Sequence, residues 1–198
     1  MHFVHLVTWE QDLSQEDSVE YKLKTISTSG IAEALSKAQL YRYLREPEES
    51  ESICQDILAA DPENQAALRL LGLSITDQFT GDVTDRCSEA DAIFRRLTAP
   101  YGKNYYLGIL SERRAKAQMR AGRPSYVVVG LIEEAMRYFD EAEKIRPAAN
   151  EEAILRWNRC ARLLAKLPHR EAAEPPSVLG DEDTPPVPSR AHSAGVRR

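Results

Sequence analysis

The chain has 198 residues, of which 42% are hydrophobic, and a formal net charge of -5 at pH 7. This length and composition suit one domain with a substantial core. The negative charge gives no overall attraction to nucleic acid or to an anionic membrane surface, so neither is expected as a partner. No apolar run reaches the ~18 residues that a membrane-spanning helix needs.

The three cysteines, Cys54, Cys87 and Cys160, are far apart and form no CxxC pair. Their number and spacing fit neither a disulfide framework nor a zinc site. The N-terminus lacks the basic region and the small-residue cleavage site of a signal peptide. We therefore expect a cytoplasmic protein.

The two ends of the chain differ from its middle. Residues 1–29 form a leader with a short apolar stretch, and whether it is ordered is left open. Residues 168–198 hold six of the eleven prolines and few large apolar side chains, so a disordered tail is expected there. The tail also contains a PxxPxR string at 185–190, which resembles ligands of proline-reading domains but arises by chance in proline-rich tails. The folded domain is expected over residues 30–167.

Helical periodicity begins at residue 31. In residues 31–46, IAEALSKAQLYRYLRE, apolar side chains recur every three or four residues. A second helix is expected to begin at Pro47, a residue suited to the first helical position, and to end at Asp61-Pro62. Residues 65–79, QAALRLLGLSITDQF, predict a third helix directly afterwards. The pattern is therefore helix, short turn, helix.

The helices repeat one spacing of small and apolar residues. In the stretch AMRYFDEAEKIRP, Ala135, Phe139 and Ala142 stand twelve, eight and five residues before Pro147, and Pro62 is preceded by a similar set. The residues in three successive units are Ser50, Cys54 and Ile57; Ala90, Phe94 and Leu97; and Ala135, Phe139 and Ala142. In the middle unit the aligned proline, Pro100, comes two residues early. Such self-similarity is typical of repeat proteins.

This spacing resembles the tetratricopeptide repeat (TPR) family, whose unit of about 34 residues is a pair of antiparallel helices. The resemblance is carried by L-x2-L-G-x2-I at 68–75, A-x3-F-x2-A-x4-P at 135–147 and DPENQAAL at 61–68. It implies an all-α fold, namely an α-solenoid of antiparallel helix pairs with a right-handed superhelical twist. The alternative is an ordinary helical bundle that shows these spacings by chance.

About three degenerate repeats cover residues 31–167. Extra residues around TGDVTDRC and AGRPSYVVVG depart from the family period and predict elongated helices or protruding loops. Residues 149–167 have no second helix after them, so they are expected to form the terminal helix that caps the array.

The sequence offers little for catalysis. The four histidines, His2, His5, His169 and His192, lie outside the helical region, and no HExxH, GxSxG or glycine-rich phosphate loop occurs. Acid–base chemistry would depend on carboxylates such as Asp77 or Glu112, and a carboxylate-dependent hydrolase or transferase is the third functional alternative. We expect no enzyme, no cofactor and no metal site.

The TPR resemblance implies that the first helix of each pair lines a concave groove that holds a peptide or helix of a partner protein. The family's groove positions, carried onto this sequence, are Gln39, Arg42, Tyr43, Arg69, Asp77, Tyr105, Glu112, Arg113, Asn158 and Arg162. The leading hypothesis is therefore a non-enzymatic protein–protein interaction module or adaptor. The second hypothesis, from another functional class, is a secretion-type or client-specific chaperone of the TPR type.

Charge is unevenly distributed along the chain. Residues 10–63 carry 13 acidic side chains against 5 basic ones, whereas 103–123 and the terminal helix are mainly basic. Opposite charges at the two ends leave head-to-tail self-association open as a second kind of partnership.

Overall fold

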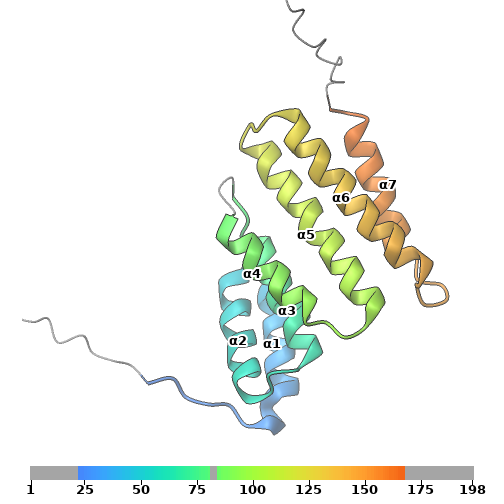
Figure 1. Cartoon of the computed structure of the whole chain (residues 1–198). Helices are drawn as coiled ribbons and strands as arrows, with labels where there is room; N and C mark the ends of the chain where they lie inside the picture. The colour runs from blue at the N-terminus through green and yellow to red at the C-terminus, as the bar shows by residue number, and fades with distance from the viewer. Residues whose placement is uncertain (1–21, 81–83, 168–198) are drawn as a thin grey trace, which may run out of the picture.

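A computed structural model of the chain describes residues 22–80 and 84–167, and all of its regular structure within these ranges is helical. A 3-10 turn at Thr28–Gly30 precedes seven α-helices (Figure 1). The helices are α1 Ile31–Tyr43, α2 Pro47–Ala60, α3 Gln65–Asp77, α4 Thr84–Arg95, α5 Pro100–Arg120, α6 Ser125–Lys144 and α7 Glu152–Leu164. The all-α expectation is confirmed for this part of the chain. None of these helices has the length and apolarity needed to cross a bilayer.

Local sequence explains where several helices begin and end. Pro47 and Pro100 occupy the first turns of α2 and α5, where a missing backbone N–H costs nothing. Asn64 caps α3, because its side-chain oxygen accepts a hydrogen bond from the Ala67 N–H at 3.0 Å. Gly122, with φ of 68°, follows α5 in the left-handed conformation that terminates helices.

The role of Pro100 differs from its place in the repeat alignment. The alignment matched it to Pro62 and Pro147, which lie in the turns after α2 and α6, whereas Pro100 is the first residue of α5. A proline can occupy either place, because it both stops a helix and suits the start of the next one.

The third helix pair is longer than the others. Helices α5 and α6 have 21 and 20 residues, whereas the remaining α-helices have 12 to 14. The extra residues of the third unit are therefore accommodated as elongated helices, one of the two outcomes expected. Of the extra residues in the middle unit, 81–83 lie outside the described ranges. The predicted leader before residue 22 and the tail from residue 168 also lie outside them.

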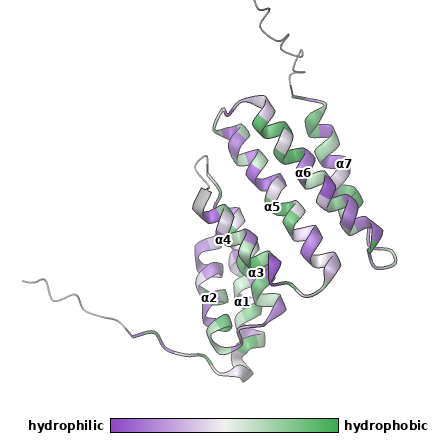
Figure 2. Cartoon of the chain, in the orientation of Figure 1, coloured by the Kyte–Doolittle hydropathy of each residue, from purple (hydrophilic) through white to green (hydrophobic). Residues whose placement is uncertain are grey.

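Each α-helix packs against the next one in the chain, and α3 also contacts α1 and α5. In Figure 1, α5, α6 and α7 run alongside one another, next to the group formed by α1 to α4. The buried side chains form two clusters, one mainly from α1 to α4 and one from α5 to α7, and both contact Leu73 and Tyr106. Figure 2 shows hydrophobic and hydrophilic residues alternating along α5, α6 and α7, as expected for helices with one buried side.

Two glycines allow an aromatic ring to lie directly against the backbone of the preceding helix. A Cβ atom on Gly72 would lie 2.4 Å from the ring of Phe94, and one on Gly108 would lie 2.5 Å from the ring of Phe139. Both rings are fully buried. These contacts join α3 to α4 and α5 to α6. The repeat spacing had singled out Gly72 and both phenylalanines.

We expect Gly72→Ala and Gly108→Ala each to lower the free energy of unfolding by about 1–2 kcal/mol, since the new methyl group must displace a packed ring. Gly130→Ala in α6 is the control, because nothing lies within 4 Å of its Cβ position. That change should raise the free energy of unfolding by about 0.5–1 kcal/mol through helix propensity. Urea denaturation followed by circular dichroism measures all three. An equal increase in the free energy of unfolding for all three variants would contradict the close packing at Gly72 and Gly108.

Candidate functional site

The carboxylate of Asp77, at the end of α3, links α1 to α5. Arg42 Nε donates to Asp77 Oδ2 at 2.6 Å, and Arg113 Nη1 lies 2.7 Å from Oδ1. Arg113 also donates to the Leu73 carbonyl oxygen at 3.0 Å. Burial lowers the pKa of the Arg113 guanidinium, and the nearby Asp77 charge opposes that shift, so the group stays protonated. Helices α1, α3 and α5 are thus held together by charge.

The carboxylate of Glu112 links α5 to α7. Its side chain is only 1% exposed, and it pairs with Lys116 one turn along α5. Across the helix interface, Arg156 Nη1 lies 3.3 Å from Oε2 and Arg159 Nε lies 3.9 Å from Oε1. Because three cations surround this carboxylate, its burial is compensated.

These ion pairs form one line across α1, α3, α5 and α7, which we call the first-helix face. Glu112 and Arg113 are consecutive on α5, and one turns to α7 while the other turns to α3. Five cations share two carboxylates along this line, so the face carries a surplus of positive charge. A surplus of this kind favours acidic ligands.

A hollow opens beside this line, between the starts of α3 and α5. Its lining consists of Gln65, Ala66, Arg69, Leu97, Ala99, Gly102 and Tyr106. The Tyr106 ring stacks on Phe94 with 5.6 Å between ring centroids, and burial raises the pKa of its hydroxyl while the nearby Arg69 charge opposes the rise. Gln65 accepts a hydrogen bond from the Thr98 N–H at 2.8 Å, which fixes the turn before α5. This α3–α5 hollow is mainly apolar, with the exposed Arg69 on its rim.

The structure brings four of the sequence-predicted groove residues together in the ion-pair line, namely Arg42, Asp77, Glu112 and Arg113. Arg69 lies at the α3–α5 hollow. On α1, Gln39 donates to the hydroxyl of the exposed Tyr43 at 3.1 Å. On α7, Asn158 is partly buried and Arg162 is exposed.

Tyr105 is 8% exposed and packs between Tyr101, Tyr106 and Phe139. The residue that lines the hollow is its neighbour Tyr106, which sequence reasoning missed. The two consecutive tyrosines were the only signal in the sequence. Which tyrosine lines the hollow depends on how α5 is rotated about its axis, and the sequence does not give that rotation.

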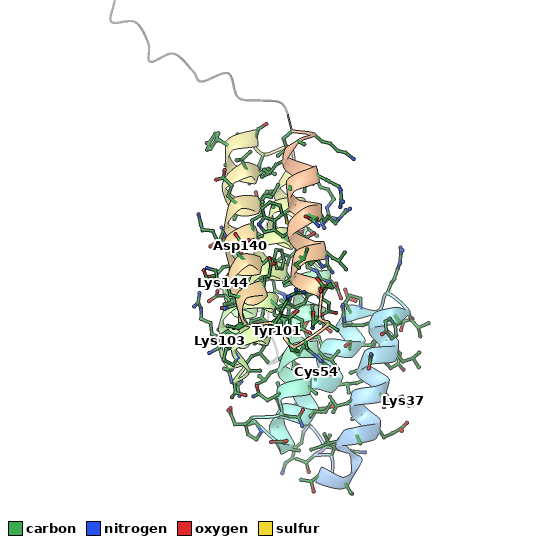
Figure 3. All side chains as sticks on the ribbon, turned by 90° about the vertical axis from the view of Figure 1, so that its right-hand side faces the viewer. Lys37, Cys54, Tyr101, Lys103, Asp140 and Lys144 are labelled. Carbon is green, nitrogen blue, oxygen red and sulfur yellow. The ribbon has the colours of Figure 1, made fainter. Side chains whose placement is uncertain are left out.

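A second hollow, which we call the α4–α6 hollow, was also missed. It follows two adjoining depressions that share Glu134 and Tyr138, and it extends along α6 past Asp140 and Lys144. Figure 3 labels Asp140 and Lys144 on this helix. Several of its charges pair within one helix, as in Arg95 with Asp91 at 2.5 Å and Lys144 with Glu141 at 2.6 Å, and Ser111 of α5 donates a hydrogen bond to Glu134 of α6 at 3.1 Å. Residues of α4, α5 and α6 line this hollow, so its shape depends on how the three helices pack and no local pattern predicts it.

No family model, curated protein or solved structure matches this chain. The resemblance to TPR proteins therefore rests on the spacing of residues in the sequence alone.

The three cysteines are buried, and the described residues offer no metal cluster. Burial raises the pKa of the Cys54 thiol to about 12 and that of Cys160 to about 11, and it also raises that of Cys87. Thiols with such pKa values remain neutral and unreactive near pH 7. Within residues 22–80 and 84–167, no three His, Cys, Asp or Glu side chains are grouped to hold a metal ion. All four histidines lie outside these ranges.

We expect Glu112→Gln to lower the free energy of unfolding by about 2–3 kcal/mol, because Lys116 and Arg156 lose their buried counter-charge while retaining partial access to water. Glu33→Gln is the control, since Glu33 and Lys37 form an exposed pair at 3.7 Å. The control should change stability by less than about 0.5 kcal/mol. Urea denaturation of both variants measures the difference. A Glu112→Gln protein as stable as the control would show that the buried carboxylate is not stabilising.

The three native thiols should react slowly with an aromatic disulfide reagent at pH 8, and all three should react rapidly in denaturant. Because folding raises the pKa of these thiols, their contribution to stability is complete below the unfolded thiol pKa. It is lost as the pH rises from there through about 12 for Cys54. Absorbance of the released thiolate measures the rates, and rapid release from the native protein would contradict the burial.

Proposed function

We propose that the chain is a non-enzymatic protein–protein interaction module built as a TPR-like solenoid, with the first helices of its pairs forming the binding face. Support for the repeat arrangement comes from α3, which contacts both α1 and α5, as first helices of stacked pairs do. The matching contacts of Gly72 with Phe94 and Gly108 with Phe139 support two equivalent pairs. In this arrangement α7 is the terminal helix that covers the last pair.

The observation that carries the proposal is the α3–α5 hollow on the first-helix face. Leu97, Ala99 and the Tyr106 ring offer a small apolar recess for one side chain of a partner segment. The exposed Arg69 on its rim supplies a donor for a carboxylate or carbonyl oxygen next to that anchor.

The ion-pair line serves this proposal as a rigid floor rather than as a set of free binding groups. Asp77 and Glu112 are already paired with cations, so a partner that sought those carboxylates would have to break the pairs. The same pairing leaves neither carboxylate available as a general base, which supports a binding role over a hydrolytic one. The partner would instead meet the exposed cations at the edges of the line.

The test begins with a photo-crosslinking residue at Ala66, on the wall of the hollow, in the full chain. The control carries the same residue at the exposed Glu133 on α6. A partner captured from cells at position 66 but not at 133 would be identified by mass spectrometry and purified for binding measurements. Capture at 133 alone would place the binding site elsewhere.

Arg69→Glu should then weaken that partner's affinity by tenfold or more in calorimetric titration, which corresponds to about 1.4 kcal/mol. The matched control is Arg137→Glu, the same charge change at an exposed residue of the α4–α6 hollow. Both variants should unfold at the wild-type denaturant concentration. If Arg137→Glu weakens binding and Arg69→Glu does not, the partner uses the α4–α6 hollow and the proposal is wrong.

A further inference from the structure

Helix α7 presents an outer side that combines leucines with cations. A hollow along this side is lined by Leu155, Arg159, Arg162, Leu163 and Lys166, which recur every three or four residues. The opposite side of α7, with Ala153 and Cys160, is buried against the neighbouring helices. Leu155, in the first turn of α7, is 65% exposed and lies beside the cations of this side. We call this side the α7 face.

The chemistry of the α7 face specifies what it would bind. Three cations surround two leucines, and no acidic side chain is among the described residues that line the hollow. A ligand that covers it must therefore bring apolar side chains together with carboxylates. A second copy of the same face is a poor occupant, since a symmetric pairing would set its cations against their equivalents.

The sequence that follows α7 contains such a segment. Residues 177–183 read SVLGDED, and they combine the only leucine after residue 167 with the only run of three consecutive acidic residues in the chain. Proline pairs at 175–176 and 185–186 flank the segment. We propose that residues 177–183 dock on the α7 face, with Val178 and Leu179 covering its leucines and the three acidic residues meeting its cations.

The connection is long enough for this contact. Leu155 and Leu167 are separated by 12 residues of mainly helical chain, or about 18 Å. The 12 residues from Leu167 to Leu179 can span up to about 40 Å when extended. A tether of this length gives an effective concentration on the order of millimolar, so even a weak contact would be populated.

Docking here would also alter the neighbouring first-helix face. Arg159 lines the α7 face and lies 3.9 Å from Glu112 of the ion-pair line. Three acidic residues beside Arg159 would reduce the surplus positive charge at that end of the line. The contact itself requires no partner bound at the α3–α5 hollow, so it can be tested independently of the proposed function.

The experiment places a spin label on residue 177 of the full chain through Ser177→Cys. The three native cysteines are buried and have raised pKa values, so the new thiol reacts first. The spin label broadens the NMR signals of nearby nuclei. If residue 177 lies on the α7 face, the methyl signals of Leu155 and Leu163 should therefore lose most of their intensity. The signals of Leu40, on α1, and Leu44, directly after it, should keep their intensity and serve as the internal control.

Charge variants then test the specificity of the contact. Arg162→Glu/Lys166→Glu should restore the Leu155 and Leu163 signals, as should neutralising residues 181–183 with D181N, E182Q and D183N. The matched control, Lys22→Glu/Lys24→Glu, makes the same charge change before α1 and should leave the broadening intact. Combining Arg162→Glu/Lys166→Glu with lysine at 181–183 should bring the broadening back, because the charges are exchanged.

Three outcomes would overturn the proposal. One is full intensity at Leu155 and Leu163 in the labelled wild-type background. Another is equal broadening at Leu40 and Leu44, which would mean that the segment samples the whole surface. The third concerns a mixture of isotope-labelled chains that lack the spin label with spin-labelled chains at natural isotope abundance. Broadening of the isotope-labelled signals in this mixture would assign the contact to a second copy.

Discussion

The close approach of an aromatic ring to a bare backbone sets the spacing of the central helices. Gly72 faces Phe94, and Gly108 faces Phe139, at distances that leave no space for a Cβ atom. Because protein interiors are close-packed, the absence of one methyl group determines how near two helices can lie. One contact joins α3 to α4 and the other joins α5 to α6. Other interactions are needed to hold these two pairs of helices together.

Helix α5 supplies much of that connection. Its residue Tyr106 contacts both buried clusters, and consecutive residues Glu112 and Arg113 carry opposite charges to opposite neighbours. Residues one apart on a helix point about 100° away from each other, so a Glu-Arg dipeptide can serve two interfaces at once. The pairing leaves both carboxylates compensated by cations that would otherwise repel each other. The length of α5 gives it room for both roles, since it has 21 residues.

Some charged groups of the first-helix face are already paired with one another, whereas others remain exposed to a partner. Residues in the ion-pair line hold neighbouring helices together, so changing them tests folding as much as binding. Arg69 and Tyr106 at the α3–α5 hollow, and Arg162 and Lys166 on the α7 face, are better placed to meet another chain segment. Under the proposed function, a ligand would bind at recesses beside this rigid line of ion pairs, and the surplus of positive charge would favour ligands that carry carboxylates.

The sequence by itself determined the helices, because helical periodicity and prolines at first turns are local. Its repeat spacing singled out Gly72, Phe94 and Phe139, but the structure showed that the rings of Phe94 and Phe139 lie against Gly72 and Gly108. The sequence also indicated that the extra residues of the third unit would lengthen helices or form loops. Only the tertiary structure decided that Glu112 is buried among cations, that Tyr106 rather than Tyr105 lines the hollow, and that α4 and α6 border a second one. These features depend on the rotation and crossing of helices, which arise from the sum of many distant contacts. No short spacing in the chain encodes that sum.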